Sequence, residues 1–262
     1  MKTGIFVDAE NIRLNGGFGM RYDTLMSVVK GSGGELIRAN AYVVEDPRRA
    51  AVDPEAAEKL QLYFRVLREM GFRLLKKIAK TYTADDGSTQ TKANVDMDLA
   101  LDILDQAEFL DRIVLLTGDG DFTRVVTTAQ ARGCRVEIIA FKNVSKDLTE
   151  AADQFTNGYL VPGLLPIANE RTHRGHVIAS ENVADKGFGF FRMPKLVDGV
   201  IEVENIFFHV SKLVEPDEQE KLIVPKGSCV TSIFEFDIEP SDRREGDVQA
   251  TNIKLLTEGV RV

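Results

Sequence analysis

Residues 112–122 read RIVLLTGDGDF, and this stretch shows the pattern on which the first half of the chain is built. Four apolar residues, 113–116, end a short predicted strand, and a glycine turn carrying Asp119 and Asp121 follows. A helical pattern begins near Phe122. A strand that leads through a short turn into a helix is the repeating unit of parallel α/β sheets.

The same alternation extends on both sides of this stretch. The pattern predicts strands at 5–8, 35–44, 72–78, 112–116 and 135–140, and helices at 22–29, 54–70, 95–106, 122–132 and 145–155. Residues 80–93 are expected to form a long surface loop. Because right-handed crossovers place helices on both sides of such a sheet, we expect an α/β fold with a parallel sheet and helices on both faces.

The pattern changes after residue 162. Pro162 and Pro166 frame a polar stretch, and short apolar runs with turn signals and little helix follow it. These runs predict strands at 175–179, 187–193, 204–209, 228–239 and 248–256, which is the strand count of a small all-β OB-type barrel. We therefore expect a first domain over 1–162, a linker over 163–174 and a barrel domain over 175–262.

The composition is that of an ordinary water-soluble protein and does not reveal a basic nucleic-acid-binding tail. The 262 residues are 44% hydrophobic and 28% charged, and the net charge is −8. No apolar run approaches the roughly 20 residues of a membrane span, so cytoplasmic residence without membrane contact is the expectation. The two cysteines, Cys134 and Cys229, are far apart and are both predicted to be core residues.

Four aspartates occupy the positions where predicted strands meet loops or helices. Asp8 ends the first predicted strand, Asp119 and Asp121 follow the strand at 112–116, and Asp96 opens a predicted helix. The carboxyl ends of parallel strands share one edge of the sheet, where ligands usually bind. Carboxylates gathered there repel one another unless a cation neutralises them, and hard oxygen ligands suit Mg²⁺ or Mn²⁺. The sequence therefore predicts a divalent-metal site that acts on phosphate esters.

Three motifs in this order resemble the NYN domain of the LabA-like group, within the PIN-like nuclease superfamily. They are FVDAEN at 6–11, KANVD at 92–96 with LALD at 99–102, and TGDGDF at 117–122. The resemblance spans residues 1 to about 160, and it implies a parallel-sheet fold with one acidic metal site and an RNA-cleaving role. It implies that Asp8, Asp96, Asp119 and Asp121 are the acidic positions, and that Asn11 is the asparagine that follows the first of them.

The expected roles follow from the chemistry of phosphodiester hydrolysis. Asp8, Asp96 and Asp119 are expected to hold Mg²⁺ or Mn²⁺ directly or through water, because the ion lowers the pKa of a bound water and clamps the phosphate. Asp121 either completes the metal site or acts as a base for the attacking water. Asn11 is expected to orient Asp8 or touch substrate.

Other residues near these motifs have a more modest expected role. Lys92 is a candidate phosphate contact. Asp98, Asp102 and Asp105 recur at helical spacing, which is typical of a solvated helix face, and Asp102 stays open as an outer residue of the site. The glycine-rich stretch NGGFG at 15–19 lacks the spacing of a dinucleotide or Walker loop and is interpreted as a flexible rim loop.

Non-catalytic interpretations of the aspartates remain open. Asp8 and Asp119 are suited to capping a following turn or helix. The GDGD motif at 118–121 also resembles the late acidic motif of haloacid-dehalogenase-type phosphatases, but the second aspartate which those enzymes need two residues after the first is Glu10 here. The phosphatase alternative is therefore the weaker one.

The second half resembles a cold-shock domain in two motifs, KGFGFF at 186–191 and IFFHVS at 206–211. Alternate strand residues face the same way, so Phe188 and Phe190 would project together from one strand, and Phe207 and His209 from its neighbour. Such rings stack on unpaired bases, whereas Phe191 and Phe208 are expected to face the core. The resemblance implies that Lys186 also contacts the nucleic acid.

The barrel departs from the cold-shock pattern in three ways, two of which remove stacking rings and weaken the expected binding. The chain has no tryptophan, Val210 stands where the family has a further aromatic residue, and the loop over 194–203 is expected to be longer than usual. The complete expectation is a Mg²⁺- or Mn²⁺-dependent ribonuclease for single-stranded RNA whose barrel holds the strand. The alternatives are a non-catalytic RNA-binding regulator or assembly factor, and a barrel that binds protein.

Overall fold

The computed structural model describes residues 1–83, 89–92, 95–167, 169–225, 228–241 and 246–262, without the side chains of 49–50, 80–83, 89–92 and 179. Within these ranges the first part of the chain forms a six-stranded sheet in the order β3-β2-β1-β6-β7-β8. The pairs β1–β2, β1–β6, β2–β3 and β6–β7 are parallel. The strands are β1 (Lys2–Asp8), β2 (Glu35–Glu45), β3 (Arg73–Ile78), β6 (Arg112–Leu116), β7 (Arg135–Ala140) and β8 (Gln154–Asn157). The predicted α/β class is confirmed.

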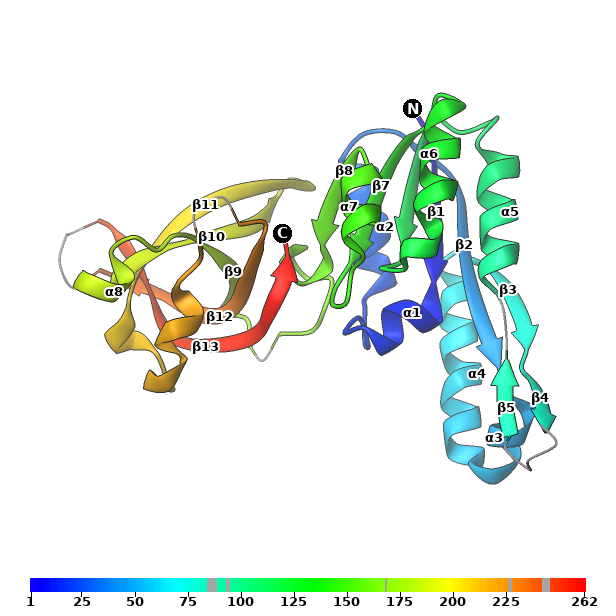
Figure 1. Cartoon of the computed structure of the whole chain (residues 1–262), viewed down its shortest axis with the longest axis horizontal. Helices are drawn as coiled ribbons and strands as arrows, with labels where there is room; N and C mark the ends of the chain where they lie inside the picture. The colour runs from blue at the N-terminus through cyan, green and yellow to red at the C-terminus, as the bar shows by residue number, and fades with distance from the viewer. Residues whose placement is uncertain (84–88, 93–94, 168, 226–227, 242–245) are drawn as a thin grey trace. The chain divides into compact units, whose positions relative to one another are not determined.

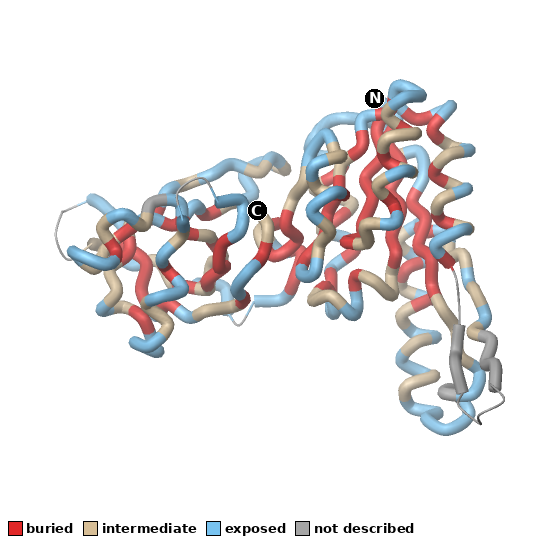
Figure 2. The backbone as a smooth tube through the Cα atoms, in the orientation of Figure 1, coloured by how far each residue is buried: buried red, intermediate tan, exposed pale blue. Residues whose placement is uncertain are grey.

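Helices separate these strands, as Figure 1 shows. They are α1 (Ala9–Leu14), α2 (Tyr22–Gly31), α3 (Pro47–Val52), α4 (Pro54–Glu69), α5 (Asp96–Gln106), α6 (Thr123–Ala131) and α7 (Lys146–Ala151). Residues of α5, α6 and α7 pack against one face of the sheet in a core that includes Phe6. Ile5 and Val7 point to the opposite face and are also fully buried, so both faces are covered. Figure 2 shows this burial along the sheet strands.

Two segments differ from the sequence-based expectation. Residues 80–93 were expected to form a loop, but the described part contains the antiparallel pair β4 (Lys80–Thr83) and β5 (Thr89–Lys92). The helix expected over 145–155 ends at Ala151, and β8 follows it as a strand of the sheet. Short, polar strands such as QFTN lack the apolar run by which buried strands are found in a sequence.

The second part of the chain is a closed five-stranded barrel in the order β10-β11-β13-β12-β9. Its strands are β9 (Thr172–Ala179), β10 (Phe188–Val197), β11 (Val200–His209), β12 (Val230–Pro240) and β13 (Val248–Arg261), with α8 (Val183–Lys186) before β10. Neighbouring strands are antiparallel, except for the parallel pair β11–β13. Phe191 stacks on Phe208 and Phe236 inside the barrel, with centroid distances of 4.3 and 4.7 Å.

The expectation of a long loop over 194–203 is wrong. Strands β10 and β11 pair as far as Val197 and Val200, and only Asp198 and Gly199 connect them. Both connecting residues have positive φ, 50° and 81°. This is the conformation of a two-residue hairpin turn whose twist matches that of the strands.

The chain divides into two compact units that interleave in sequence. One comprises residues 1–18, 33–140 and 144–155, and the other comprises residues 19–32, 141–143 and 156–262. The domain limits expected from the sequence stay a prediction. Cys134 is buried as expected, but Cys229 is exposed, because it precedes β12 instead of lying within it. Among the described helices, none is long and apolar enough to cross a membrane.

Candidate acidic active site

Asp8 lies at the end of β1, and its carboxylate is held on both oxygens. Its side chain is buried and caps α1, with Oδ1 accepting a hydrogen bond from the Asn11 amide at 3.1 Å. Oδ2 accepts a hydrogen bond from Thr117 Oγ1 at 3.2 Å. Asp8 therefore has the capping role that the sequence left open as an alternative. The cap uses only Oδ1, and the carboxylate lies where the central strands end.

The turn after β6 is joined to the first helix by hydrogen bonds. Because Val7 pairs with Leu116 in neighbouring parallel strands, the residues that follow them meet at one edge. Asn11 Oδ1 accepts a hydrogen bond from the Gly118 amide at 3.0 Å, and Thr117 Oγ1 accepts one from the Asp119 amide at 3.3 Å. Thr117 was not among the expected site residues. Its position directly after a strand, next to Asp8 in register, is the signal that could have found it.

Asp119 and Asp121 form the polar end of the same turn. Asp119 Oδ1 accepts a hydrogen bond from the Asp121 amide at 3.0 Å and caps the short 3₁₀ helix η1 (Gly120–Phe122). A side chain at position 120 would place its Cβ 2.7 Å from Ser145 Oγ, so the glycine permits this close approach. Asp121 is exposed, and its carboxylate is at the surface of the turn.

Asp96 opens α5 as expected, and the acidic residues that follow it have structural partners. Asp98 forms an ion pair with Lys77 at 2.7 Å. Asp102 accepts a hydrogen bond from the hydroxyl of the buried Tyr42 at 2.6 Å. These contacts place Asp98 and Asp102 on the side of α5 that faces β2 and β3. Asp102 therefore has a structural role as the partner of the Tyr42 hydroxyl, and this role needs no contact with a metal.

Burial and neighbouring aspartates raise the pKa values of Asp8 and Asp96. Burial raises the pKa of Asp8 to about 6, and the negative charges of Asp96 and Asp119 add to the rise, against two hydrogen bonds that lower it. The pKa of Asp96 is also raised, first by desolvation and then by the charges of Asp119 and Asp121. Repulsion of this kind favours either protonation or a bound cation. The charges of Asp96, Asp119 and Asp121 thus act on Asp8, on Asp96 or on both, and the positions of these four aspartates are called the acidic edge below.

The four aspartates offer only oxygen donors, the kind of ligand that Mg²⁺ and Mn²⁺ prefer. Among the residues whose positions the structure gives, no three His, Cys, Asp or Glu side chains lie close enough together to hold one ion. Mg²⁺ is usually held by one or two carboxylates and retains several water ligands. An ion held by Asp8, Asp96, Asp119 and Asp121 would therefore have to keep water between itself and most of these side chains. The side chain of Lys92, the expected phosphate contact, lies outside the described residues.

The barrel presents the expected aromatic face. Phe188 pairs with His209 across β10 and β11, and Phe190 pairs with Phe207. The Phe207 ring lies 5.9 Å from that of Phe188 and 5.8 Å from that of Phe190, measured between centroids. Each of these four side chains is at least partly exposed, whereas Phe191 and Phe208 are buried, as expected. The structure thus brings together a small aromatic surface.

Two further residues complete the description of this surface. Lys186 is exposed at the end of α8, just before Gly187, which has a φ of 69°. His209 Nδ1 accepts a hydrogen bond from the Ser211 amide at 3.2 Å, so one ring nitrogen has a partner within the barrel.

Comparison with known proteins identifies the family of the first part of the chain. The family model described as NYN domain matches residues 2–164, which is more than half of the chain. "Low amplitude and bright protein LabA" of Synechococcus elongatus is 25% identical over 89 residues, which cover 33% of this chain and 48% of that protein. The chain thus matches about half the length of this curated relative. A protein of unknown function from Vibrio parahaemolyticus is 27% identical with a TM-score of 0.48, covering 59% of this chain and 91% of its own.

Proposed function

The chain belongs to the NYN domain family, and from this premise we propose that it is a divalent-metal-dependent ribonuclease that cleaves single-stranded RNA. The observation that carries the proposal is the buried carboxylate of Asp8, whose pKa is raised beside Asp96 and Asp119 at the edge where the strands end. Folding such a carboxylate next to others costs free energy, which a bound cation recovers.

Each residue of the edge has a proposed task. Asp8, Asp96 and Asp119 would hold Mg²⁺ or Mn²⁺, partly through water. The ion, when bound, would activate a water and stabilise charge on the phosphate. Asp121, which is exposed at the surface of its turn, would complete the metal site or accept the proton of the attacking water.

Other side chains would prepare this edge for the reaction. Thr117 orients the carboxylate of Asp8 by donating a hydrogen bond to Oδ2, while Oδ1 accepts the hydrogen bond from the Asn11 amide that caps α1. Asn11 acts as a positioning residue, because its side chain holds the Gly118 amide and thereby the turn that carries Asp119. Lys92 is proposed to contact a phosphate of the strand. These tasks orient carboxylates before substrate arrives, so little reorganisation accompanies the reaction.

The barrel is proposed to hold the RNA strand as a cold-shock-like nucleic-acid-binding domain. Phe188, Phe190, Phe207 and His209 would stack on unpaired bases, and Lys186 would meet the backbone. The net charge of −8 opposes binding of a polyanion, so the affinity should be modest and should fall with added salt. A weak second site on the same chain still raises the local concentration of RNA at the first.

A non-catalytic RNA-binding regulator is the second candidate, and one observation favours it. Within the described ranges, no three acidic, histidine or cysteine side chains are gathered tightly enough for direct ligation of one ion. In that case the aspartates would hold their turns through the caps of α1 and η1, and the barrel would carry the function. A phosphatase remains the weakest alternative.

Incubation of purified protein with a labelled single-stranded RNA separates these candidates. The ribonuclease proposal predicts cleavage in Mg²⁺ or Mn²⁺, none in EDTA, and recovery when metal is restored. A duplex of the same sequence should be cleaved much more slowly, because its bases are stacked and paired. Binding of intact RNA without cleavage in either metal would support the regulator instead.

A further inference from the structure

The glycine-rich loop at residues 15–19 is tied to α1. The Asn15 amide and side-chain Nδ2 both donate to the Asn11 carbonyl, at 3.0 and 2.8 Å, and the Gly17 amide donates to the Ile12 carbonyl at 2.8 Å. Gly16 has a φ of 101° and Gly19 a φ of 80°, conformations that glycine adopts without strain. The loop therefore has a defined backbone path after the helix.

This path presents an aromatic ring to solvent. Phe18 is 79% exposed, while its neighbour Gly17 is buried. Leu14, at the end of α1, is 65% exposed. A single exposed apolar residue is common on protein surfaces and does not by itself indicate a binding site. The position of Phe18 relative to the aspartates is therefore the observation that matters.

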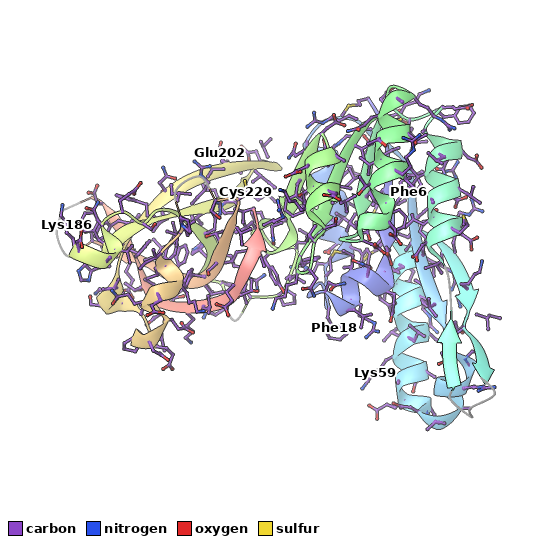
Figure 3. The ribbon with its side chains drawn as sticks, in the orientation of Figure 1. Phe6, Phe18, Lys59, Lys186, Glu202 and Cys229 are labelled. Carbon is purple, nitrogen blue, oxygen red and sulfur yellow. The ribbon has the colours of Figure 1, made fainter. Side chains whose placement is uncertain are left out.

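One short helix and a short loop connect Asp8, at the acidic edge, to Phe18. Helix α1 begins directly after Asp8 and is only six residues long, so its two ends are about 9 Å apart. Asn11 links the two features, because its side chain holds the Gly118 amide and its carbonyl holds Asn15. Figure 3 shows Phe18 beside α1, beyond the end of the strand that carries Phe6.

We propose that Phe18 stacks on an unpaired base of the strand whose phosphodiester lies at the acidic edge. The inference rests on the proposed ribonuclease function and adds a base-binding position within the same compact unit. An uncharged aromatic ring stacks on the face of a base and does not bind the phosphate. Because every base has such a face, the stacking does not depend on the RNA sequence. A paired base has no free face, so the position selects single strands. It also holds the strand within a few nucleotides of the carboxylates.

Substitutions at Phe18 test stacking against a matched control. Phe18→Ala removes the ring, Phe18→Leu keeps an apolar side chain without a ring, and Phe18→Trp keeps a ring. Phe109→Ala is the control, because Phe109 is 70% exposed but lies before β6, at the opposite edge of the sheet. The KM for a single-stranded oligonucleotide should rise roughly 5- to 100-fold in the alanine and leucine variants and stay near wild type in the other two.

An abasic strand shows whether the effect belongs to the bases. With abasic nucleotides throughout, wild type and Phe18→Ala should have equal KM values. Equal KM values for the base-containing strand would overturn the inference while leaving the ribonuclease intact. If wild type cleaves nothing in metal, photo-crosslinking of a 4-thiouridine strand decides. A crosslink at Phe18 then supports the stacking position alone, and its absence rejects it.

Discussion

Asn11 Oδ1 accepts a hydrogen bond from the Gly118 amide at 3.0 Å, which joins the first helix to the turn that carries two of the acidic residues. The two residues are far apart in sequence and meet because β1 and β6 are neighbours in the sheet. The same asparagine donates its amide to Asp8. One side chain and its backbone thus connect both halves of the acidic edge.

Asn11→Ala tests this connection. Loss of the acceptor leaves the Gly118 amide without its partner, and we expect the free energy of unfolding to fall by about 1–2 kcal/mol. The rate of RNA cleavage should fall by more than the loss of folded protein accounts for, because the turn that carries Asp119 is no longer fixed. Urea unfolding and single-turnover cleavage measure the two effects. Asn11→Gln, which keeps a neutral amide acceptor, should recover part of the stability; equal losses in both variants would contradict the positioning role.

Asp8→Asn should stabilise the metal-free protein at neutral pH. The folded pKa of Asp8, about 6, lies above the ordinary value of 3.8, so the folded state binds more protons between these values. Stability of the wild type therefore declines as pH rises from about 4 to 6, and the charged carboxylate costs up to about 3 kcal/mol above that range. Thermal unfolding in EDTA at pH 7 and pH 4 should show a gain for the variant at pH 7 only. Mg²⁺ or Mn²⁺ should then stabilise wild type and not the variant.

His176 should make the barrel sensitive to acid. It lies in β9, where burial lowers its pKa to about 4, with the charge of Arg192 adding to the effect. The folded state thus keeps the ring neutral, and the stability it contributes is present above about pH 6.5 and is lost as pH falls toward 4. Urea unfolding at pH 7 and pH 4.5 should show a larger loss for wild type than for His176→Gln, by about 1–3 kcal/mol. Equal losses would show that another group causes the acid sensitivity.

The aromatic surface of the barrel is expected to govern RNA affinity without governing the fold. Replacing Phe190 and Phe207 together by alanine should weaken binding of single-stranded RNA roughly 10- to 100-fold in fluorescence anisotropy. Leu196→Ala is the matched control, because Leu196 is 42% exposed on the same hairpin but outside the aromatic pairs. If the control weakens binding as much as the double variant, the hairpin as a whole, and not the rings, holds the strand.

The parts of the fold that could be predicted are those whose local pattern and tertiary role agree. The buried strand at 112–116 and the helix at 95–106 have strong apolar patterns, and the structure places both close to the expected limits. Strand β8 could not be found in this way, because QFTN is short and polar and is defined by its place beside β7. The hairpin turn at Asp198 and Gly199 could have been found, because an Asp-Gly pair between apolar residues is the usual sequence signal of a two-residue hairpin.

The sequence could predict which residues lie at the site, but it could not predict which residues they contact. Residues at strand ends converge in any parallel sheet, so the place of Asp8 and Asp119 followed from strand assignment alone. The partners of Asp98 and Asp102 depended on which strand lies beside α5, which the sequence does not state. Thr117 was missed for the same reason, since its hydrogen bond to Asp8 requires that β1 and β6 be adjacent.

The most direct test of the account compares turnover by Asp119→Asn and Asp105→Asn on a labelled single-stranded RNA in Mn²⁺. Both changes remove one negative charge from the same compact unit, but Asp105 is exposed near the C-terminal end of α5, the end away from Asp96. We predict that wild type and Asp105→Asn cleave the RNA at similar rates and that Asp119→Asn does not cleave it, while all three remain folded. Cleavage by Asp119→Asn at the wild-type rate would contradict the claim that the acidic edge is the catalytic site.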